Sequence, residues 1–141
     1  MNTDQAAFFF GRIAIGVNFL VHGIVRIPKL SQFTEGMIKG FSETWLPEIL
    51  VYSFAFSLPF LELFIGIFLF LGLKTKESLM TGGFLIIILI FGTGLKEDWS
   101  LVSSQMIYVI FFFLMLKNVN FNSYSLDTFK KTRIEGFRSA K

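Results

Sequence analysis

The chain has 141 residues, of which 53% are hydrophobic, only 16% are charged and 20 are phenylalanine. A water-soluble domain of this size could not bury so much apolar surface, because small domains leave a large fraction of their chain exposed. The composition also excludes intrinsically disordered, collagen-like and nucleic-acid-binding classes. We therefore expect an integral membrane protein that has membrane lipids, and no nucleic acid, among its partners.

Four apolar segments are long enough to cross about 30 Å of hydrocarbon as helices. They run over residues 6–25, 48–73, 78–95 and 100–117. The first is not interpreted as a signal peptide, because Arg12 interrupts its apolar run and no small-residue cleavage site follows. Runs such as FLIIILIF at 84–91 lack the alternation of a membrane barrel. The sequence predicts an all-α, integral membrane four-helix bundle as one domain over residues 1–118.

Two segments outside the spans have the periodicity of amphipathic helices. The outer loop at 28–46 places four apolar residues on one helical face: Leu30, Phe33, Met37 and Phe41. The basic tail at 119–141 carries a similar stripe: Leu126, Phe129, Ile134 and Phe137. We expect both to lie at the membrane interface, with Lys130, Lys131, Arg133 and Arg138 of the tail beside anionic headgroups. The alternative is a loop and a frayed tail with no membrane role.

The distribution of lysine and arginine predicts the orientation. The N-terminus, the turn at 74–77 and the tail share one side and carry eight of these residues, whereas the two opposite loops carry four. Since cytoplasmic segments carry the excess of positive charge, we expect both termini in the cytoplasm. Trp45 and Trp99 then fall at the opposite interface, as an aromatic belt requires.

Polar side chains within membrane spans are costly, so each is a candidate functional residue. The candidates are Arg12, Asn18, His22, Glu62, Gln105 and Tyr108. On a helical wheel, Gly16 and Gly23 share the face of Arg12, which should therefore point into the bundle. The axial offset between Arg12 and Glu62 is about 7 Å by helical rise, within reach of an arginine side chain. We expect an Arg12–Glu62 ion pair and a ligand-binding polar pocket lined by all six side chains.

A purely structural interpretation of the same residues stays open. The pair of Arg12 and Glu62 could hold the helices together without any ligand. His22 could be a hydrogen-bonding residue at the interface, and Gln105 and Tyr108 could cross-link helices.

The order of these residues resembles that of the DoxX family of four-helix membrane proteins, over roughly residues 8–116. The first span matches in Arg12, Gly16, Phe19 and His22–Gly23, followed by a basic residue at Arg26 or Lys29. The second matches in Glu62, Gly66, Gly72–Leu73 and Thr75–Lys76. The resemblance implies a protein related to the small subunit of a thiosulfate:quinone oxidoreductase, working beside redox enzymes in the cytoplasmic membrane of a bacterium. It does not cover the tail beyond residue 118.

Two functions follow as expectations, and whether the chain is an enzyme stays open. The first is a redox-associated accessory subunit that binds a quinone or another lipophilic ligand, with electrons supplied by a partner membrane or redox protein. The sequence has no cysteine and a single histidine, so no metal site or covalent cofactor is expected. The alternative is a non-catalytic scaffold of a larger membrane complex. A small carrier ranks last, because four spans without internal symmetry are few for alternating access unless the chain forms a homo-oligomer.

Overall fold

The computed structural model describes residues 2–139, and within that range the side chains of residue 131 and residues 134–139 lie outside the description. Its elements in chain order are α1 (Thr3–Arg26), η1 (Ile27–Lys29), α2 (Leu30–Phe41), α3 (Glu48–Leu71), α4 (Thr75–Leu95), α5 (Trp99–Lys117), η2 (Val119–Phe121) and α6 (Leu126–Ser139). Over residues 2–139 there is no strand, and α1, α3, α4 and α5 are long and apolar enough to cross a membrane. The predicted all-α four-helix bundle is confirmed.

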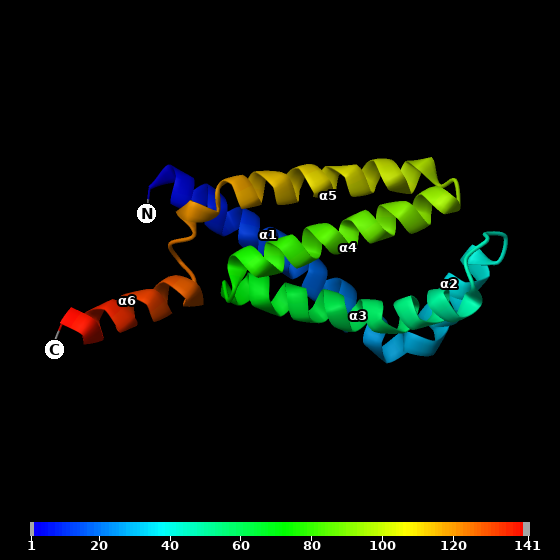
Figure 1. The fold of residues 1–141 in the computed structure, drawn as a ribbon, viewed down its shortest axis with the longest axis horizontal. Coiled ribbons are helices and arrows are strands. Elements are labelled where there is room, and N and C mark those ends of the chain that lie inside the picture. Colours follow the sequence, from blue (N-terminus) through cyan, green and yellow to red (C-terminus); the bar gives the residue numbers. More distant parts are fainter. Residues whose placement is uncertain (1, 140–141) are drawn as a thin grey trace.

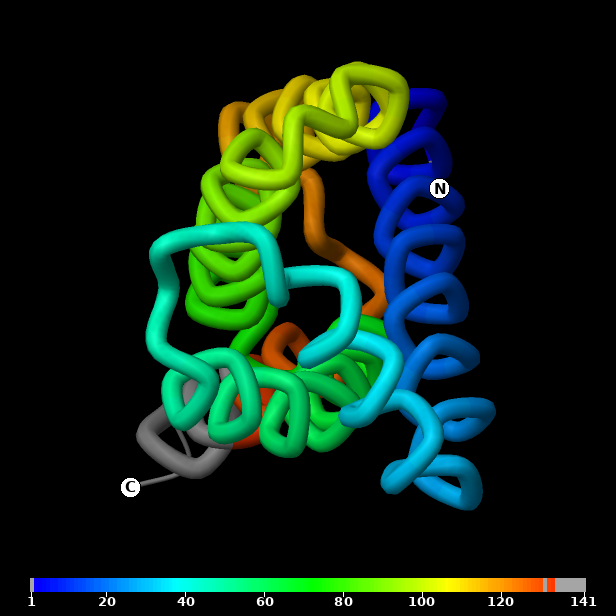
Figure 2. Tube along the Cα trace, turned by 90° about the vertical axis from the view of Figure 1, so that its right-hand side faces the viewer, coloured from blue at the N-terminus to red at the C-terminus, as the bar shows by residue number. Residues whose placement is uncertain are grey.

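The four long helices lie side by side around a common axis (Figures 1 and 2). The start of α1, the end of α5 and the whole of α6 lie toward one end of the molecule, and α2 lies at the other (Figure 1). We call the half of the bundle that holds the start of α1 and the end of α5 the terminal half, and the half that α2 covers the α2 half. The hairpin of α4 and α5 diverges from α1 and α3 toward the α2 half (Figure 1).

Each predicted span matches one helix to within three residues at either end. α1 starts earlier than predicted, because Asn2 and Gln5 form a capping box in which each side chain accepts from the other's backbone N–H. α3 ends at Leu71, because Gly72 after it adopts the left-handed conformation with φ of 65°. The spans could therefore be predicted closely from hydropathy, whereas their ends depend on local caps.

Glycine residues let α1 and α3 pack at backbone distance. A Cβ at Gly16 would lie 2.8 Å from the backbone nitrogen of Phe70, and one at Gly66 would collide with the backbone of Leu20. Small residues at such a crossing are typical of helix pairs in membranes, where close van der Waals packing replaces the hydrophobic effect. The predicted inward face of α1 is confirmed, since Arg12, Gly16, Phe19 and Gly23 are all buried.

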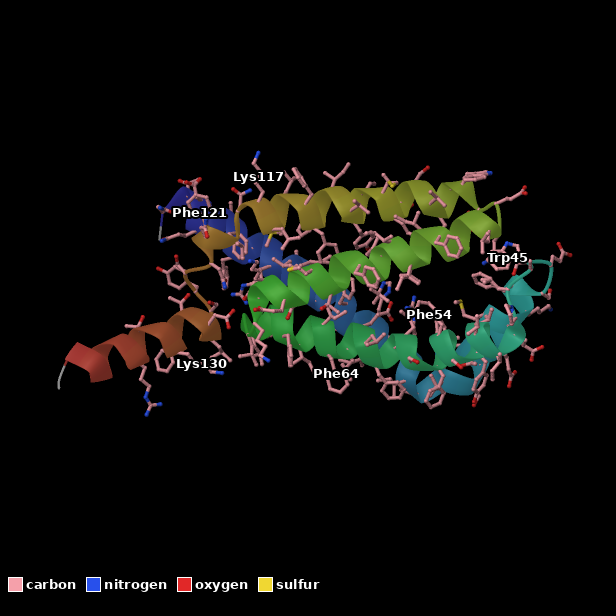
Figure 3. The ribbon with its side chains drawn as sticks, viewed as in Figure 1. Trp45, Phe54, Phe64, Lys117, Phe121 and Lys130 are labelled. Carbon is pink, nitrogen blue, oxygen red and sulfur yellow. The ribbon has the colours of Figure 1, made fainter. Side chains whose placement is uncertain are left out.

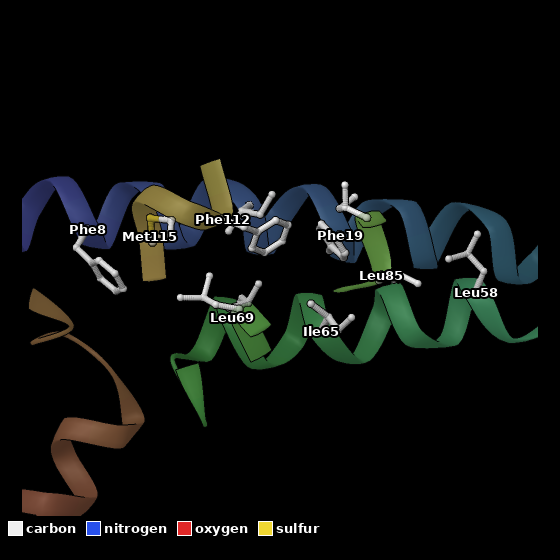
Figure 4. Close-up of a cluster of buried hydrophobic side chains, with 11 residues drawn as sticks. Phe8, Phe19, Leu58, Ile65, Leu69, Leu85, Phe112 and Met115 are labelled. Atoms are coloured by element: carbon white, nitrogen blue, oxygen red, sulfur yellow. The ribbon is translucent and has the colours of Figure 1, made fainter. Parts of the chain in front are cut away.

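The apolar core fills the terminal half (Figure 4). It is built by buried side chains from α1, α3, α4 and α5, among them Phe8, Phe19, Ile65, Leu69, Phe112 and Met115. The rings of Phe19 and Phe112 meet edge to face with centroids 5.8 Å apart, and the core continues past them to Leu58 beside the α2 half. The terminal half is therefore closed by packed side chains.

The predicted amphipathic helix of the outer loop is present as α2, but its apolar face points inward. Thr34 and Phe41 are buried, whereas Gln32, Glu35 and Lys39 are exposed. α2 packs on α3, because the diverging α4–α5 hairpin leaves apolar surface of α3 uncovered in this half. The apolar face of α2 therefore contacts the protein itself, and the location of the helix at the membrane interface stays a prediction.

The tail forms the predicted helix as α6, which extends away from the bundle at the terminal end (Figure 1). Leu126 and Phe129 of the predicted stripe are exposed. The side chains of Lys131, Ile134, Phe137 and Arg138 lie outside the described residues. Figure 3 shows Lys117 and Lys130 at the end of the molecule opposite Trp45, so these basic and aromatic side chains mark opposite ends of the bundle.

Candidate functional site

Glu62 lies near the middle of α3, with 6% of its side chain exposed. One guanidinium nitrogen of Arg26, Nη1, donates to both carboxylate oxygens at 2.5 and 2.6 Å. Nδ1 of His22, one helical turn before Arg26, lies 3.7 Å from the same carboxylate, and 44% of the His22 side chain is exposed. Between these two residues, Gly23 brings α1 against the backbone of Pro59 and so positions both polar side chains beside Glu62.

The predicted pair of Arg12 and Glu62 is not formed. Nη1 of Arg12 donates to the carbonyls of Leu69 at 2.7 Å and Phe70 at 3.0 Å, and Nη2 donates to that of Tyr124 at 2.5 Å. The last carbonyls of a helix have no partner within it, and Arg12 satisfies them at the end of α3. Glu62 pairs with Arg26 instead, because α1 continues as one helix through Arg26 and carries it to the depth of Glu62.

A cavity of about 530 Å³ opens in the α2 half, beside Glu62. Most of its wall is apolar and comes from α1, α2, α3, α4 and α5, and Figure 3 shows Phe54 on the α4-facing side of α3. Five of the six predicted site residues line this one cavity: Asn18, His22, Glu62, Gln105 and Tyr108. Arg12 does not, since it lies at the terminal end.

Four polar residues of the wall were missed from the sequence: Arg26, Thr93, Lys96 and Ser104. Arg26 and Lys96 were assigned to loops, although each lies at or just beyond a helix end. Thr93 and Ser104 carry no signal in the sequence, because their hydroxyls donate to carbonyls of the preceding turn of their own helices. The positive charge at the span ends was the one available signal for Arg26 and Lys96.

On the α4–α5 side of the cavity, Gln105 cross-links the two helices. Its amide nitrogen donates to Oγ1 of Thr93 at 3.0 Å, and that hydroxyl in turn donates to the carbonyl of Leu89 at 2.7 Å. Because the Thr93 hydroxyl uses its hydrogen to donate to Leu89, it can only accept from Gln105. The amide nitrogen of Gln105, and not its oxygen, must therefore face Thr93. Oε1 of Gln105 is buried without a hydrogen-bond partner. An unsatisfied buried acceptor is a costly feature in a packed interior.

α2 covers the mouth of the cavity. Phe33, Met37 and Phe41 of α2 line it, and cations of the neighbouring elements lie over two of these rings. The Arg26 guanidinium is 4.9 Å from the centre of Phe33, and Nζ of Lys96 is 5.3 Å from the centre of Phe41. Such cation–π contacts fix α2 to both sides of the bundle.

The first residues of the tail are built into the terminal end, which the sequence did not indicate. The carboxylate of Asp127 accepts from the backbone nitrogens of Lys74 at 2.7 Å and Thr75 at 2.8 Å, and so caps α4. Asn122 donates to the hydroxyl of Thr75 at 2.9 Å. With the Arg12 bond to Tyr124, these contacts tie residues 122–127 to α1, α3 and α4.

The arrangement suits binding of an amphipathic molecule more than metal chemistry. Ligand sites are typically concave, mostly apolar and supplied with a few placed polar groups, as this cavity is. Among the described residues, no three His, Cys, Asp or Glu side chains gather in a way that could hold a metal ion. No family model, curated protein or solved structure matches this chain. The DoxX resemblance therefore stays a prediction that depends on the residues quoted for it.

Proposed function

We propose that this protein is a redox-associated accessory subunit of a membrane, and that it binds a quinone or another lipophilic ligand in the cavity of the α2 half. The observation that carries the proposal is the buried Glu62 carboxylate, paired with Arg26 at the wall of an otherwise mostly apolar cavity of about 530 Å³. A charged group so deep in a membrane span is expensive to keep and marks functional sites by default. The resemblance to the DoxX family supports the same proposal.

The residues present fit a quinone head group. A quinone ring is flat and apolar except for its carbonyl oxygens, which accept hydrogen bonds. Arg26 and His22 provide donors on the α1 side of the cavity, and the hydroxyl of Tyr108 provides one on the α5 side. Glu62 is placed to take up or deliver a proton through His22, which is the more exposed of the two. We assign the supply of electrons to a partner redox protein, since the chain has no cysteine for thiol or iron–sulfur chemistry and a single histidine.

We further propose that the membrane is the cytoplasmic membrane of a bacterium and that the α2 half faces outward. The resemblance to the DoxX family supports the bacterial membrane, and the charge count supports the orientation, since the terminal end carries most of the lysine and arginine outside the spans. A homo-oligomer is compatible with the broad apolar surface, on which Phe64, Ile107 and Phe113 are exposed.

The test is whether the purified protein carries a quinone. Protein from native membranes is extracted and the extract analysed by mass spectrometry, and added quinone is titrated into the protein in lipid nanodiscs. We expect a quinone in the extract and saturable binding that Glu62→Gln weakens. An empty extract together with no binding of added quinone would refute the proposal.

A scaffold role is favoured by a different observation: the polar side chains also join helices. Arg26 and Glu62 link α1 to α3, and Gln105 and Thr93 link α5 to α4. As a scaffold, the protein should co-purify with a larger membrane complex. Glu62→Gln should then lower its stability while leaving any quinone binding intact, the opposite pattern to that of a ligand site.

A further inference from the structure

α1 and α5 contact each other in the terminal half. A Cβ at Gly11 would lie 2.8 Å from the sulfur of Met115, and Phe19 meets Phe112 edge to face. These residues define the face of each helix that points toward the other. Side chains from both helices join the closed core at this level.

The same two faces become polar in the α2 half. Seven residues correspond to about two turns of helix and return to nearly the same face. On α1 this step leads from Gly11 to Asn18 and from Ile15 to His22. On α5 it leads back from the contact residues to positions that all line the cavity: Tyr108 from Met115, Ser104 from Phe111 and Gln105 from Phe112.

These polar faces are not closed against each other. Figure 2 shows α1 beside α5 at its N-terminal end and close to α3 at its other end. His22 and Ser104 are exposed, and Asn18 and Tyr108 are half-buried. Polar side chains that face hydrocarbon are unfavourable, whereas those that line an occupied or water-filled opening are tolerated. The lining of the cavity is therefore accessible from the α1–α5 side, at His22 and Ser104.

We propose that a chain-bearing ligand reaches the cavity from the membrane through this side opening, with its head group at Glu62 and its chain passing between α1 and α5. This inference depends on the proposed function and names the substrate class more closely, as a lipid-borne molecule with a long chain. A cavity of about 530 Å³ has the size of a site for one drug-sized molecule, so a long isoprenoid chain must leave it.

Two other sides of the cavity are closed, and the exposed residues that line its α3–α4 side are apolar: Leu50, Ile88 and Phe91. The Phe19–Phe112 pair and the core beyond it close the floor toward the terminal half. α2 covers the mouth and is attached through Phe33 and Phe41 to Arg26 and Lys96. With the floor and the mouth closed, the isoprenoid chain of the ligand leaves sideways into the leaflet that surrounds the α2 half, and the polar side chains exposed between α1 and α5 distinguish that side from the apolar α3–α4 side.

Two neighbouring serines provide a matched test. Ser103 and Ser104 are both exposed on α5, and the hydroxyl of each donates to the carbonyl four residues earlier. Ser104 lines the cavity at the opening, whereas Ser103 is outside the set of lining residues. Ser104→Trp should fill the opening, and Ser103→Trp adds the same side chain to the lipid-facing side.

Two quinones serve as probes. One is a dimethoxybenzoquinone with a long isoprenoid chain, and the other has the same ring with a methyl group in place of that chain.

Binding is measured in lipid nanodiscs as protection from a photoreactive quinone, quantified by mass spectrometry of the intact chain. We expect Ser104→Trp to weaken binding of the long-chain quinone about tenfold or more, and to change binding of the methyl quinone less than about threefold. Ser103→Trp should change neither. Unchanged long-chain binding in Ser104→Trp would overturn the inference, and so would an equal loss of both quinones, which would place Ser104 in the head-group site. If the unaltered protein binds neither probe, the proposed function itself fails.

Discussion

Arg12 and Glu62 are both almost enclosed by protein, with 2% and 4% of their surfaces exposed, yet their surroundings differ. Arg12 lies in the terminal half and donates to three main-chain carbonyls, with packed side chains and the tail around it. Glu62 lies in the α2 half and shares its carboxylate with Arg26 beside a cavity. A buried charged side chain thus helps to close the terminal half of the bundle, whereas in the α2 half a buried charged side chain lines a space large enough for a ligand.

The difference follows from how the helices cross. α1 and α3 stay in backbone contact along most of their length because of Gly16, Gly23 and Gly66. α5 meets α1 at Gly11 and Phe19 in the terminal half, and the α4–α5 hairpin diverges from α1 toward the α2 half. Stability should therefore depend mainly on the terminal half, and binding mainly on the α2 half.

The largest effect on stability is expected from Arg12→Ala. The change removes charge-assisted hydrogen bonds to carbonyls at the end of α3 and leaves a void where the side chain was. We expect the unfolding free energy, measured by denaturation with a harsh detergent, to fall by about 4 kcal/mol. Arg12→Lys, which keeps the charge but not the fork of donors, should lose less.

Quinone binding separates this prediction from a role of Arg12 in the site. Arg12→Ala protein that remains folded should bind quinone with unchanged affinity, because Arg12 does not line the cavity. A selective loss of quinone binding at unchanged stability would show that the terminal half also takes part in binding, contrary to the proposal.

A matched pair of glycines tests the packing of α1 on α3. In Gly66→Ala the new Cβ collides with the backbone of Leu20, whereas a Cβ at Gly94 meets nothing within 4 Å. We expect Gly66→Ala to lower the unfolding free energy by about 2 to 3 kcal/mol through overpacking. Gly94→Ala should raise it by up to about 1 kcal/mol, because alanine favours the helix. Effects of the same sign would mean that close backbone packing does not hold α1 and α3 together.

The role of the tail is tested by Asp127→Ala. This change removes the acceptors for the backbone nitrogens of Lys74 and Thr75 at the start of α4. Loss of a helix cap costs about 1 to 2 kcal/mol, and we expect a fall of that size in the unfolding free energy. Asp98→Ala is a useful comparison, since Asp98 caps α5 at the other end of the hairpin by accepting from Leu101.

Hydropathy sufficed to predict the four helices, and five of the six polar residues singled out in the spans line the cavity, whereas four other polar residues of its wall were missed. The partner of Glu62 could not be predicted, because it depends on α1 continuing past residue 25 to Arg26, where the sequence indicated a loop. The position of α2 could not be predicted either, since an inward apolar face and a lipid-facing one have the same periodicity. The contacts of Arg12 and Asp127 join residues more than 50 positions apart, and no local pattern reports them.

The smallest effect on stability is expected from Gln105→Leu in the α2 half. The change removes one hydrogen bond to Thr93 and, with it, the buried Oε1 that has no partner. Thr93 keeps its bond to the carbonyl of Leu89, so no donor is left unsatisfied. A bond between helices in a membrane contributes about 0.6 kcal/mol on average, and we expect the unfolding free energy to change by less than about 1 kcal/mol in either direction. A loss as large as that of Arg12→Ala would mean that polar side chains hold both halves together, and the cavity wall would then be structural rather than kept for a ligand.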